Sequence, residues 1–207
     1  MTTALALTRP ALVVVDVQQG FADEAFWGAR DNPACEANVA ALLAAWRRRG
    51  WPIVLVRHDS TTPGSPLAPG TPGNAFQDVV RDAFPGDDGV EPDLLVSKSV
   101  NSSFHGTPDL DAWLRAQGLT QVVVCGITTN HCCETTARVA GNLGYETFFA
   151  LDATHTFDRT APDGSVVPAS TLALVTATNL HGEFATVVTT AELSAAAEGS
   201  ATQRSRR

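Results

Sequence analysis

Six short apolar runs, separated by stretches of helical character, most constrain how this chain can fold. Each run is continuous in apolar residues rather than alternating, which is typical of strands covered on both faces of a parallel sheet. The runs lie at residues 11–15 (ALVVV), 53–56 (IVLV), 94–96 (LLV), 121–125 (QVVVC), 146–151 (ETFFAL) and 185–188 (ATVV).

The stretches between these runs predict helices at residues 34–49, 109–117, 131–143 and 170–180. The first ends in three arginines and Gly50, a basic last turn followed by a glycine stop. Alternating strands and helices predict one α/β domain of three layers, α/β/α, with right-handed crossovers. We place this domain at residues 1–194 and expect residues 195–207 to be a disordered tail that begins as a frayed helix end.

Composition excludes several classes of protein. The 207 residues carry a net charge of -8, which disfavours binding to nucleic acid. No run reaches the roughly 20 apolar residues of a membrane-spanning helix, and the first residues do not resemble a signal peptide. The four cysteines do not form a disulfide framework of the secreted kind. We therefore expect a cytoplasmic enzyme with reduced thiols.

Residues 59–74 (DSTTPGSPLAPGTPGN) are rich in proline and glycine and have no hydrophobic period. A segment of this kind is either a solvent-exposed loop or the lid or wall of an active site. The sequence leaves both interpretations open.

Two ionisable residues follow buried runs, at the carboxyl ends where the chemistry of such sheets collects. Asp16 ends the first run and Lys98 ends the third. Either residue alone could be a turn cap or a surface charge, but a charge next to a buried strand is costly unless it is paired. Together they predict a pair at one edge of the sheet.

The fourth run continues as CGITTNHCCETTARVA. Gly126 would end the strand, Thr129 or Asn130 could cap a helix, and Cys132 would fall in its first turn. The positive end of a helix favours a thiolate, which is the nucleophilic form of cysteine, and its N–H groups could hold an oxyanion.

The choice of reactive cysteine is open on these grounds. Cys125 ends an apolar strand and is expected in the core, as is Cys35. Cys133 shares a helical stripe with Ala137 and Ala140, which would face the sheet. Cys132, about 100° further round the helix, is slightly favoured to face the cleft.

Three groups of residues, in order and at compatible spacing, resemble the isochorismatase-like cysteine hydrolases over residues 10 to 190. The groups are Asp16, Gln18 and Phe21; Lys98 with Ser103, Phe104, Gly106 and Thr107; and Gly126 to Cys132 followed by Thr136 and Ala137. The resemblance implies a six-stranded, doubly wound parallel sheet of order 3-2-1-4-5-6. It also implies a homodimer or homotetramer.

The resemblance further implies a catalytic triad. Cys132 would be the nucleophile, Asp16 the general base, and Lys98 the group that stabilises the thiolate and charged intermediates. A non-proline cis peptide would join Ile127 to Thr128, and the backbone N–H groups of Thr128 and Cys132 would form the oxyanion hole. The reaction implied is hydrolysis of a C–N bond in a small amide, carbamoyl or lactam compound through a thioester, with no cofactor.

The sequence departs from the nicotinamidase members of this family, which carry an aspartate and two histidines for a metal after the second strand. Here that place holds only His58 and Asp59, so we expect no metal site. The segment from Gly126 to Arg159 also resembles a bacterial subgroup that includes streptothricin hydrolase.

Several further residues are candidates to line the substrate pocket, although each could equally be structural. They are Phe21, Trp27, His58, Asn101, Phe104 and His131, and the roles of Asp59 and His155 are left open. Two alternative functions also remain: a vinyl-ether hydrolase of the isochorismatase type that uses Asp16 without Cys132, and a non-catalytic binding protein with the same fold.

Overall fold

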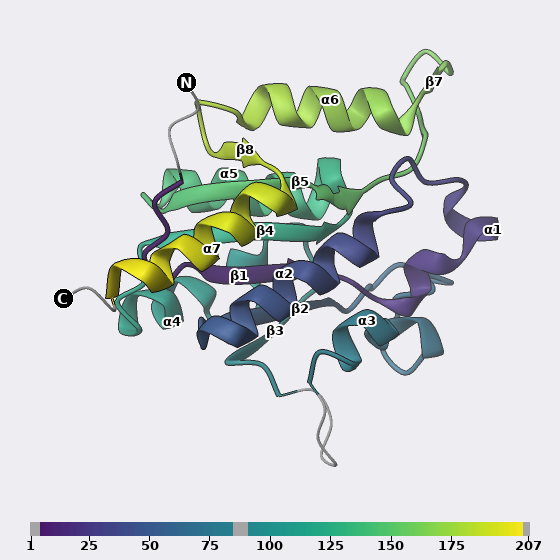
Figure 1. Cartoon of the computed structure of the whole chain (residues 1–207). Helices are drawn as coiled ribbons and strands as arrows, with labels where there is room; N and C mark the ends of the chain where they lie inside the picture. Colours follow the sequence, from purple (N-terminus) through teal and green to yellow (C-terminus); the bar gives the residue numbers. More distant parts are fainter. Residues whose placement is uncertain (1–4, 85–90, 205–207) are drawn as a thin grey trace.

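A computed structural model of the chain describes residues 5–84 and 91–204, and it contains the predicted parallel sheet (Figure 1). The six strands lie in the order β3-β2-β1-β4-β5-β8, and every neighbouring pair is parallel. This is the expected order 3-2-1-4-5-6, because β8 is the sixth strand of the sheet. The strands are β1 (Ala11–Val15), β2 (Ile53–His58), β3 (Leu94–Lys98), β4 (Gln121–Ile127), β5 (Glu146–His155) and β8 (Thr186–Val188).

Helices cover both faces of the sheet, as the continuous apolar strands require. One buried cluster joins the sheet to α2 (Cys35–Arg49), α3 (Asp78–Arg81) and α7 (Thr190–Arg204). The other joins it to α4 (Leu110–Ala116), α5 (Glu134–Asn142) and α6 (Ala169–Leu180). The layers are therefore α/β/α, as predicted. Among the small elements that the sequence did not predict are the short helices α1 (Glu24–Trp27) and α3, and the antiparallel hairpin of β6 (Arg159–Thr160) and β7 (Val166–Val167).

The expectation of a disordered tail from residue 195 is not met over residues 195–204, because α7 continues to Arg204. Leu193 and Ala197 lie one helical turn apart and are almost completely buried beside α2. This contact gives an alanine-rich segment the tertiary support that a short isolated helix lacks. Residues 205–207 of the expected tail lie outside the described residues.

The central strands come unusually close where they end. Gly126 in β4 has a φ of +121°, and a Cβ atom there would lie 2.0 Å from the carbonyl oxygen of Val15. Only glycine fits this approach. Asp16, the first residue after β1, has a φ of +52°. Aspartate tolerates this conformation better than most side chains do. The two strands thus bring their ends together at one point.

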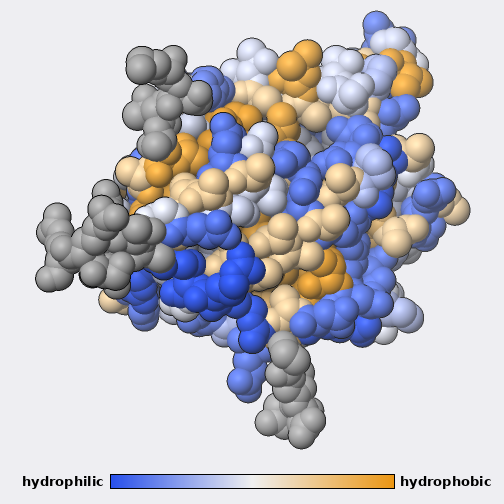
Figure 2. Space-filling model, viewed as in Figure 1, coloured by the Kyte–Doolittle hydropathy of each residue, from blue (hydrophilic) through white to orange (hydrophobic). Residues whose placement is uncertain are grey.

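Within residues 5–84 and 91–204, no helix is long and apolar enough to cross a membrane. On the face drawn in Figure 2, hydrophilic and hydrophobic residues are interspersed. The two most exposed large apolar side chains of the described residues are Leu174 of α6 and Val166 of the hairpin, which are 67% and 65% exposed. The expected homo-oligomer stays a prediction.

Candidate active site

Asp16, Lys98 and Cys132, the three residues that the sequence singled out, meet at the carboxyl end of the sheet. The Nζ atom of Lys98 lies 2.6 Å from Oδ2 of Asp16 and 3.4 Å from Sγ of Cys132. The side chains of Asp16 and Lys98 are fully buried, and Cys132 is 7% exposed. The lysine therefore contacts both the carboxylate and the sulfur in a site with very little water.

Each of these residues comes from a different element. Asp16 follows β1, Lys98 is the last residue of β3, and Cys132 lies in η4 (Thr129–Cys133), a turn of π-helix that leads into α5. The N-cap of this turn is Thr128, without a side-chain hydrogen bond, so neither Thr129 nor Asn130 acts as the cap considered above. The peptide bond between Ile127 and Thr128 is cis, as expected from the family resemblance.

The electrostatics of the site favour a protonated lysine beside a protonated thiol. Burial acts to lower the pKa of Lys98, but Asp16 and Cys132 outweigh it and the net pKa is raised. Burial, together with the negative charge of Asp16, raises the pKa of the Cys132 thiol, and Lys98 only partly offsets this. This direction is opposite to the lowered pKa that the sequence predicts for a thiol at the positive end of a helix. A carboxylate oxygen of Asp16 lies within 4.8 Å of Sγ of Cys132, close enough for Asp16 to accept the thiol proton after a small movement.

His58, at the end of β2, completes the polar floor of the site. Its Nδ1 atom lies 3.2 Å from Nζ of Lys98. Burial and the neighbouring Lys98 lower the pKa of His58, so the ring is neutral at pH 7 and accepts a hydrogen bond from the lysine.

The same floor bears on metal binding. Atoms of Asp16, His58 and Cys132 that could ligate a cation lie within 4.8 Å of one another. The ammonium group of Lys98, however, contacts all three, at 2.6, 3.2 and 3.4 Å. A divalent ion would compete with this charge for the same ligands. Because Lys98 occupies these three donors, the set does not fit a metal. Asp59 pairs instead with Arg57 through two hydrogen bonds.

The structure separates Cys132 from Cys133, between which helix geometry alone gave only a slight preference. Cys132 lines the pocket described below, whereas Cys133 is completely buried in the core with Ala137 and Ala140. Cys35 and Cys125 are also completely buried, and all four thiols are free.

A pocket of about 100 Å³ opens in front of Cys132. Five of the six predicted pocket residues line it: Phe21, Trp27, His58, Asn101 and His131. The thiol of Cys132 donates to Oδ1 of Asn101 across 3.7 Å. Phe21 and Trp27 form the expected aromatic wall, with ring centroids 4.9 Å apart.

Phe104, the sixth predicted residue, does not line this pocket. Its ring stacks on Tyr145 at a centroid distance of 6.0 Å and packs against the core under α4 and α5. The backbone N–H of its neighbour Ser103 donates to the hydroxyl of Thr136 on α5. This anchor turns the segment away from the pocket.

Sequence reasoning missed several lining residues: Leu67, Thr156, Phe157 and Arg159, together with Thr128, which had been assigned only a backbone role. Phe157 stacks on Trp27 at 5.5 Å. It stands two residues before Arg159, and residues at this spacing in an extended segment point to the same side. The sequence signal that could have identified Phe157 and Arg159 is the extended segment that follows the fifth strand.

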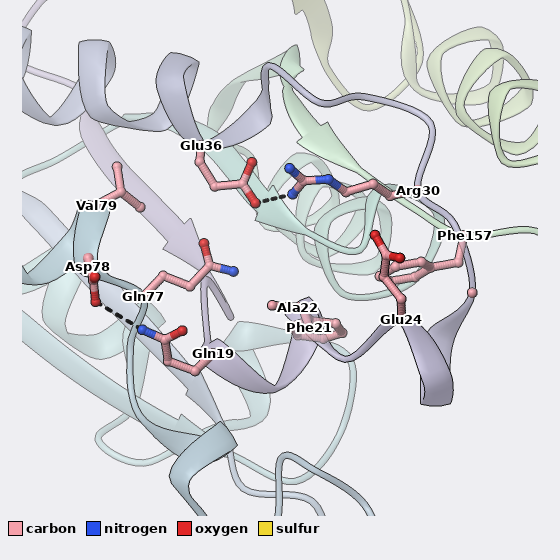
Figure 3. Close-up of a pocket in the computed structure, with 11 residues that line it drawn as sticks. Gln19, Phe21, Ala22, Glu24, Arg30, Glu36, Gln77, Asp78, Val79 and Phe157 are labelled. Carbon is pink, nitrogen blue, oxygen red and sulfur yellow. Dashed lines mark hydrogen bonds and ion pairs between the residues drawn. The ribbon is translucent and has the colours of Figure 1, made fainter.

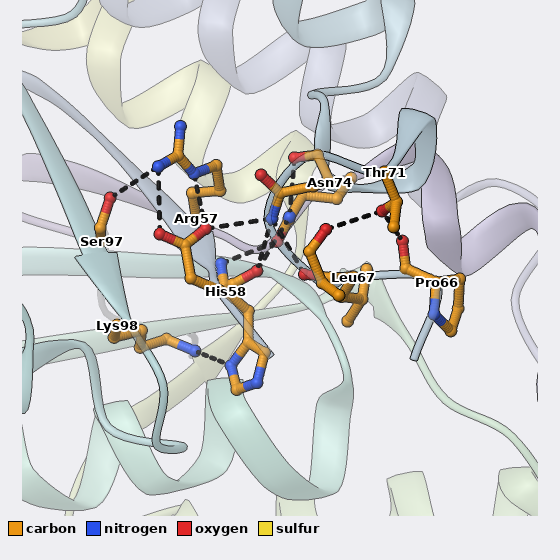
Figure 4. Close-up of polar contacts among 11 residues, drawn as sticks. Arg57, His58, Pro66, Leu67, Thr71, Asn74, Ser97 and Lys98 are labelled. Atoms are coloured by element: carbon orange, nitrogen blue, oxygen red, sulfur yellow. Dashed lines mark hydrogen bonds and ion pairs between the residues drawn. The ribbon is translucent and has the colours of Figure 1, made fainter. Parts of the chain in front are cut away.

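The loop at residues 59–74 proves to be a wall of the site, since the buried Leu67 lines the pocket. Asn74 holds the loop in place (Figure 4). Its side-chain amide donates to the carbonyl oxygens of Leu67 and His58 at 2.9 and 3.1 Å. Gln18 supports the same carbonyl of His58 and also donates to that of Asn74.

A second pocket, of about 400 Å³ (Figure 3), shares Phe21 of the aromatic wall and Phe157 with the pocket in front of Cys132. An ion pair between Arg30 and Glu36 also lines it. His155 is fully buried near this wall, edge-on to Phe157 and 4.0 Å from Glu36. It does not reach the pocket in front of Cys132.

Comparison with known proteins gives relatives that match nearly the whole chain. The isochorismatase family protein YrdC of Bacillus subtilis is 38% identical over 185 residues, covering 89% of this chain and 94% of that protein. A crystal structure described as a hydrolase of the isochorismatase family from Chromobacterium violaceum superimposes with a TM-score of 0.86. It is 37% identical, and the match covers 96% of this chain and all of that one.

Streptothricin hydrolase of Streptomyces noursei, the basis of the subgroup resemblance, is 35% identical over 165 residues. The match covers 77% of this chain and 55% of that protein, which makes it a more distant relative than YrdC. The family model described as the isochorismatase domain matches residues 10–192. The chain therefore belongs to the isochorismatase family.

Proposed function

We propose that the protein is a cysteine hydrolase that cleaves a C–N bond in a small amide, carbamoyl or lactam compound. One observation carries the proposal: Lys98 contacts both the carboxylate of Asp16 and the sulfur of Cys132 at the floor of a small pocket. Relatives named nicotinamidase (Arabidopsis thaliana), streptothricin hydrolase and ureidoacrylate amidohydrolase (Methylobacterium radiotolerans) support C–N bond hydrolysis.

In the first half of the reaction, the thiol of Cys132 gives its proton to Asp16 and the sulfur attacks the carbonyl carbon of the substrate. The raised pKa of the thiol makes this transfer part of the attack, rather than a step completed before the substrate binds. The oxyanion of the tetrahedral intermediate faces the backbone N–H groups of Thr128 and Cys132. The amine then leaves with the proton from Asp16, and a thioester remains.

In the second half, Asp16 takes a proton from water, and the resulting hydroxide attacks the thioester carbon. The carboxylic acid leaves as the C–S bond breaks, and the sulfur recovers its proton from Asp16. Lys98 stays protonated throughout and offsets the negative charge that moves between the carboxylate, the sulfur and the oxyanion. The four free thiols fit a reducing compartment, and we place the enzyme in the cytoplasm.

Ammonia or amine release over a panel of small amides, ureas and lactams tests the proposal. Cys132→Ala removes the nucleophile, and we expect activity to fall by at least about 1000-fold while the circular dichroism spectrum is unchanged. Cys133→Ala is the matched control, because this thiol is buried in the core, and it keeps activity. Loss of activity in the Cys133 variant alone, or vinyl-ether cleavage that survives Cys132→Ala, would contradict the mechanism.

A further inference from the structure

The pocket in front of Cys132 has one charged side chain at its rim. Of its lining residues within the described chain, Arg159 alone carries a formal charge at pH 7. Burial and the nearby Arg159 lower the pKa of His131, and burial lowers that of His58, so both histidine rings are neutral. Beneath the pocket, the charges of Asp16 and Lys98 cancel. The pocket thus has a neutral reactive end and a positive rim.

Arg159 has no carboxylate partner in the described chain. No carboxylate among residues 5–84 and 91–204 forms an ion pair with it. Glu134 is a nearby carboxylate, since its charge raises the pKa of His131, which Arg159 lowers. Glu134 already pairs with Arg138 at 2.7 Å and accepts a hydrogen bond from Thr176. Six other arginines of the described chain have carboxylate partners: Arg30, Arg48, Arg57, Arg81, Arg115 and Arg138. Arg9, Arg47 and Arg49 form none of these ion pairs either, but they do not line the pocket.

The guanidinium is also held in position. Its Nη2 atom lies 3.2 and 3.4 Å from the two ring nitrogens of His131, the residue before Cys132. Its backbone pairs with Val167 in the β6–β7 hairpin. The preceding residue, Asp158, anchors the hairpin to α6 by accepting from the N–H of Ala169 at 2.8 Å. A positioned guanidinium that has no carboxylate partner within the described chain matches the two oxygens of a carboxylate.

We propose that Arg159 binds a carboxylate of the substrate, so that the substrates are small amides that carry a carboxylate on the part away from the scissile bond. This inference rests on the proposed function, because it takes Cys132 as the reacting end. Cys132 and Arg159 line the same small pocket of about 100 Å³, so a compact compound could place its amide and its carboxylate on the two groups at once. The net charge of -8 acts weakly here, since salt screens charges beyond roughly 8 Å.

Protection of Cys132 against alkylation tests the proposal without requiring turnover. The rate at which iodoacetamide modifies Cys132 is followed by peptide mass spectrometry in the presence of malonamate, succinamate or glutaramate. The matched neutral probes are propanamide, butanamide and pentanamide, in which a methyl group replaces the carboxylate. We expect at least one carboxylate to protect at about 10-fold lower concentration than its neutral match, as an arginine–carboxylate contact predicts.

Three variants complete the experiment. In Arg159→Gln, the protecting concentrations of each carboxylate and its neutral match should differ by no more than about 2-fold. Arg159→Lys should keep part of the preference for the carboxylate. Arg48→Gln is the matched control, because it removes the same charge from an exposed site in the last turn of α2, at the opposite end of the sheet, and it keeps the full preference.

Two results would overturn the proposal: no preference for any of the three carboxylates in the native protein, or a preference that survives Arg159→Gln. Failure of the proposed function has a different signature. If no amide in the panel is hydrolysed, the hydrolase assignment fails, while the protection data still report whether Arg159 binds the carboxylate.

Discussion

Breaking the buried pair of Asp16 and Lys98 should destabilise the fold more than removing both charges. Both side chains are fully buried and 2.6 Å apart, and Oδ1 of Asp16 has no hydrogen-bond partner within the described chain. In Lys98→Met the carboxylate of Asp16 loses Lys98, its only ion-pair partner within the described residues. Loss of one partner of a buried pair costs about 3–5 kcal/mol.

The double variant Asp16→Asn, Lys98→Met removes both charges with little change of volume. Asparagine also tolerates the φ of +52° at position 16. We expect the double variant to lose about 3 kcal/mol less free energy of unfolding than the sum of the losses in the two single variants. The residual cost is that of an imperfectly bonded amide, roughly 1–3 kcal/mol.

Urea unfolding at pH 7, followed by circular dichroism, measures this coupling. With a denaturant slope of about 2 kcal/mol per molar urea, 3 kcal/mol corresponds to a midpoint difference of roughly 1.5 M. The reasoning is refuted if the coupling is below about 1 kcal/mol, or if Lys98→Met unfolds at the native midpoint. Either result would mean that water or a rearrangement compensates for the lost cation.

Three further predictions concern the surroundings of the site. Asn74→Ala should lower the melting temperature by roughly 4–8 °C, because buried carbonyls, including that of Leu67, lose a donor at a cost of about 2 kcal/mol; a change within about 1 °C contradicts this. Burial lowers the pKa of His155 to about 4, below its unfolded value of 6.5, so between these pH values the unfolded chain binds more protons. Stability that is complete above pH 6.5 is therefore lost as the pH falls to about 4, by about 3 kcal/mol, and His155→Phe should remove this part of the acid sensitivity in urea titrations. Gly126→Ala should yield no folded protein by circular dichroism, because its Cβ would lie 2.0 Å from the oxygen of Val15; a native-like melting curve would show that β1 and β4 can separate.

The sheet was predictable because its signal is local. A strand buried on both faces must be apolar at every position, and the six runs of this kind all became strands of the parallel sheet. Asp16 and Lys98 were predictable for a related reason, since a charge at the end of a buried strand needs a partner. The tail was misjudged because the burial of Ala197 depends on α2, about 150 residues earlier in the chain.

The sequence alone thus determined the layers, the strand order expected from the family and the pair of charges at the sheet edge. Only the tertiary structure decided which cysteine faces the pocket, since Cys132 and Cys133 differ by one step around a turn whose π-helical form no local pattern announced. It also decided that Leu67 and Arg159 line that pocket while Phe104 does not. The physical reason is that a side chain's direction and neighbours depend on contacts between segments distant in sequence. The burial of a strand, in contrast, can be predicted from the apolar character of its own consecutive residues.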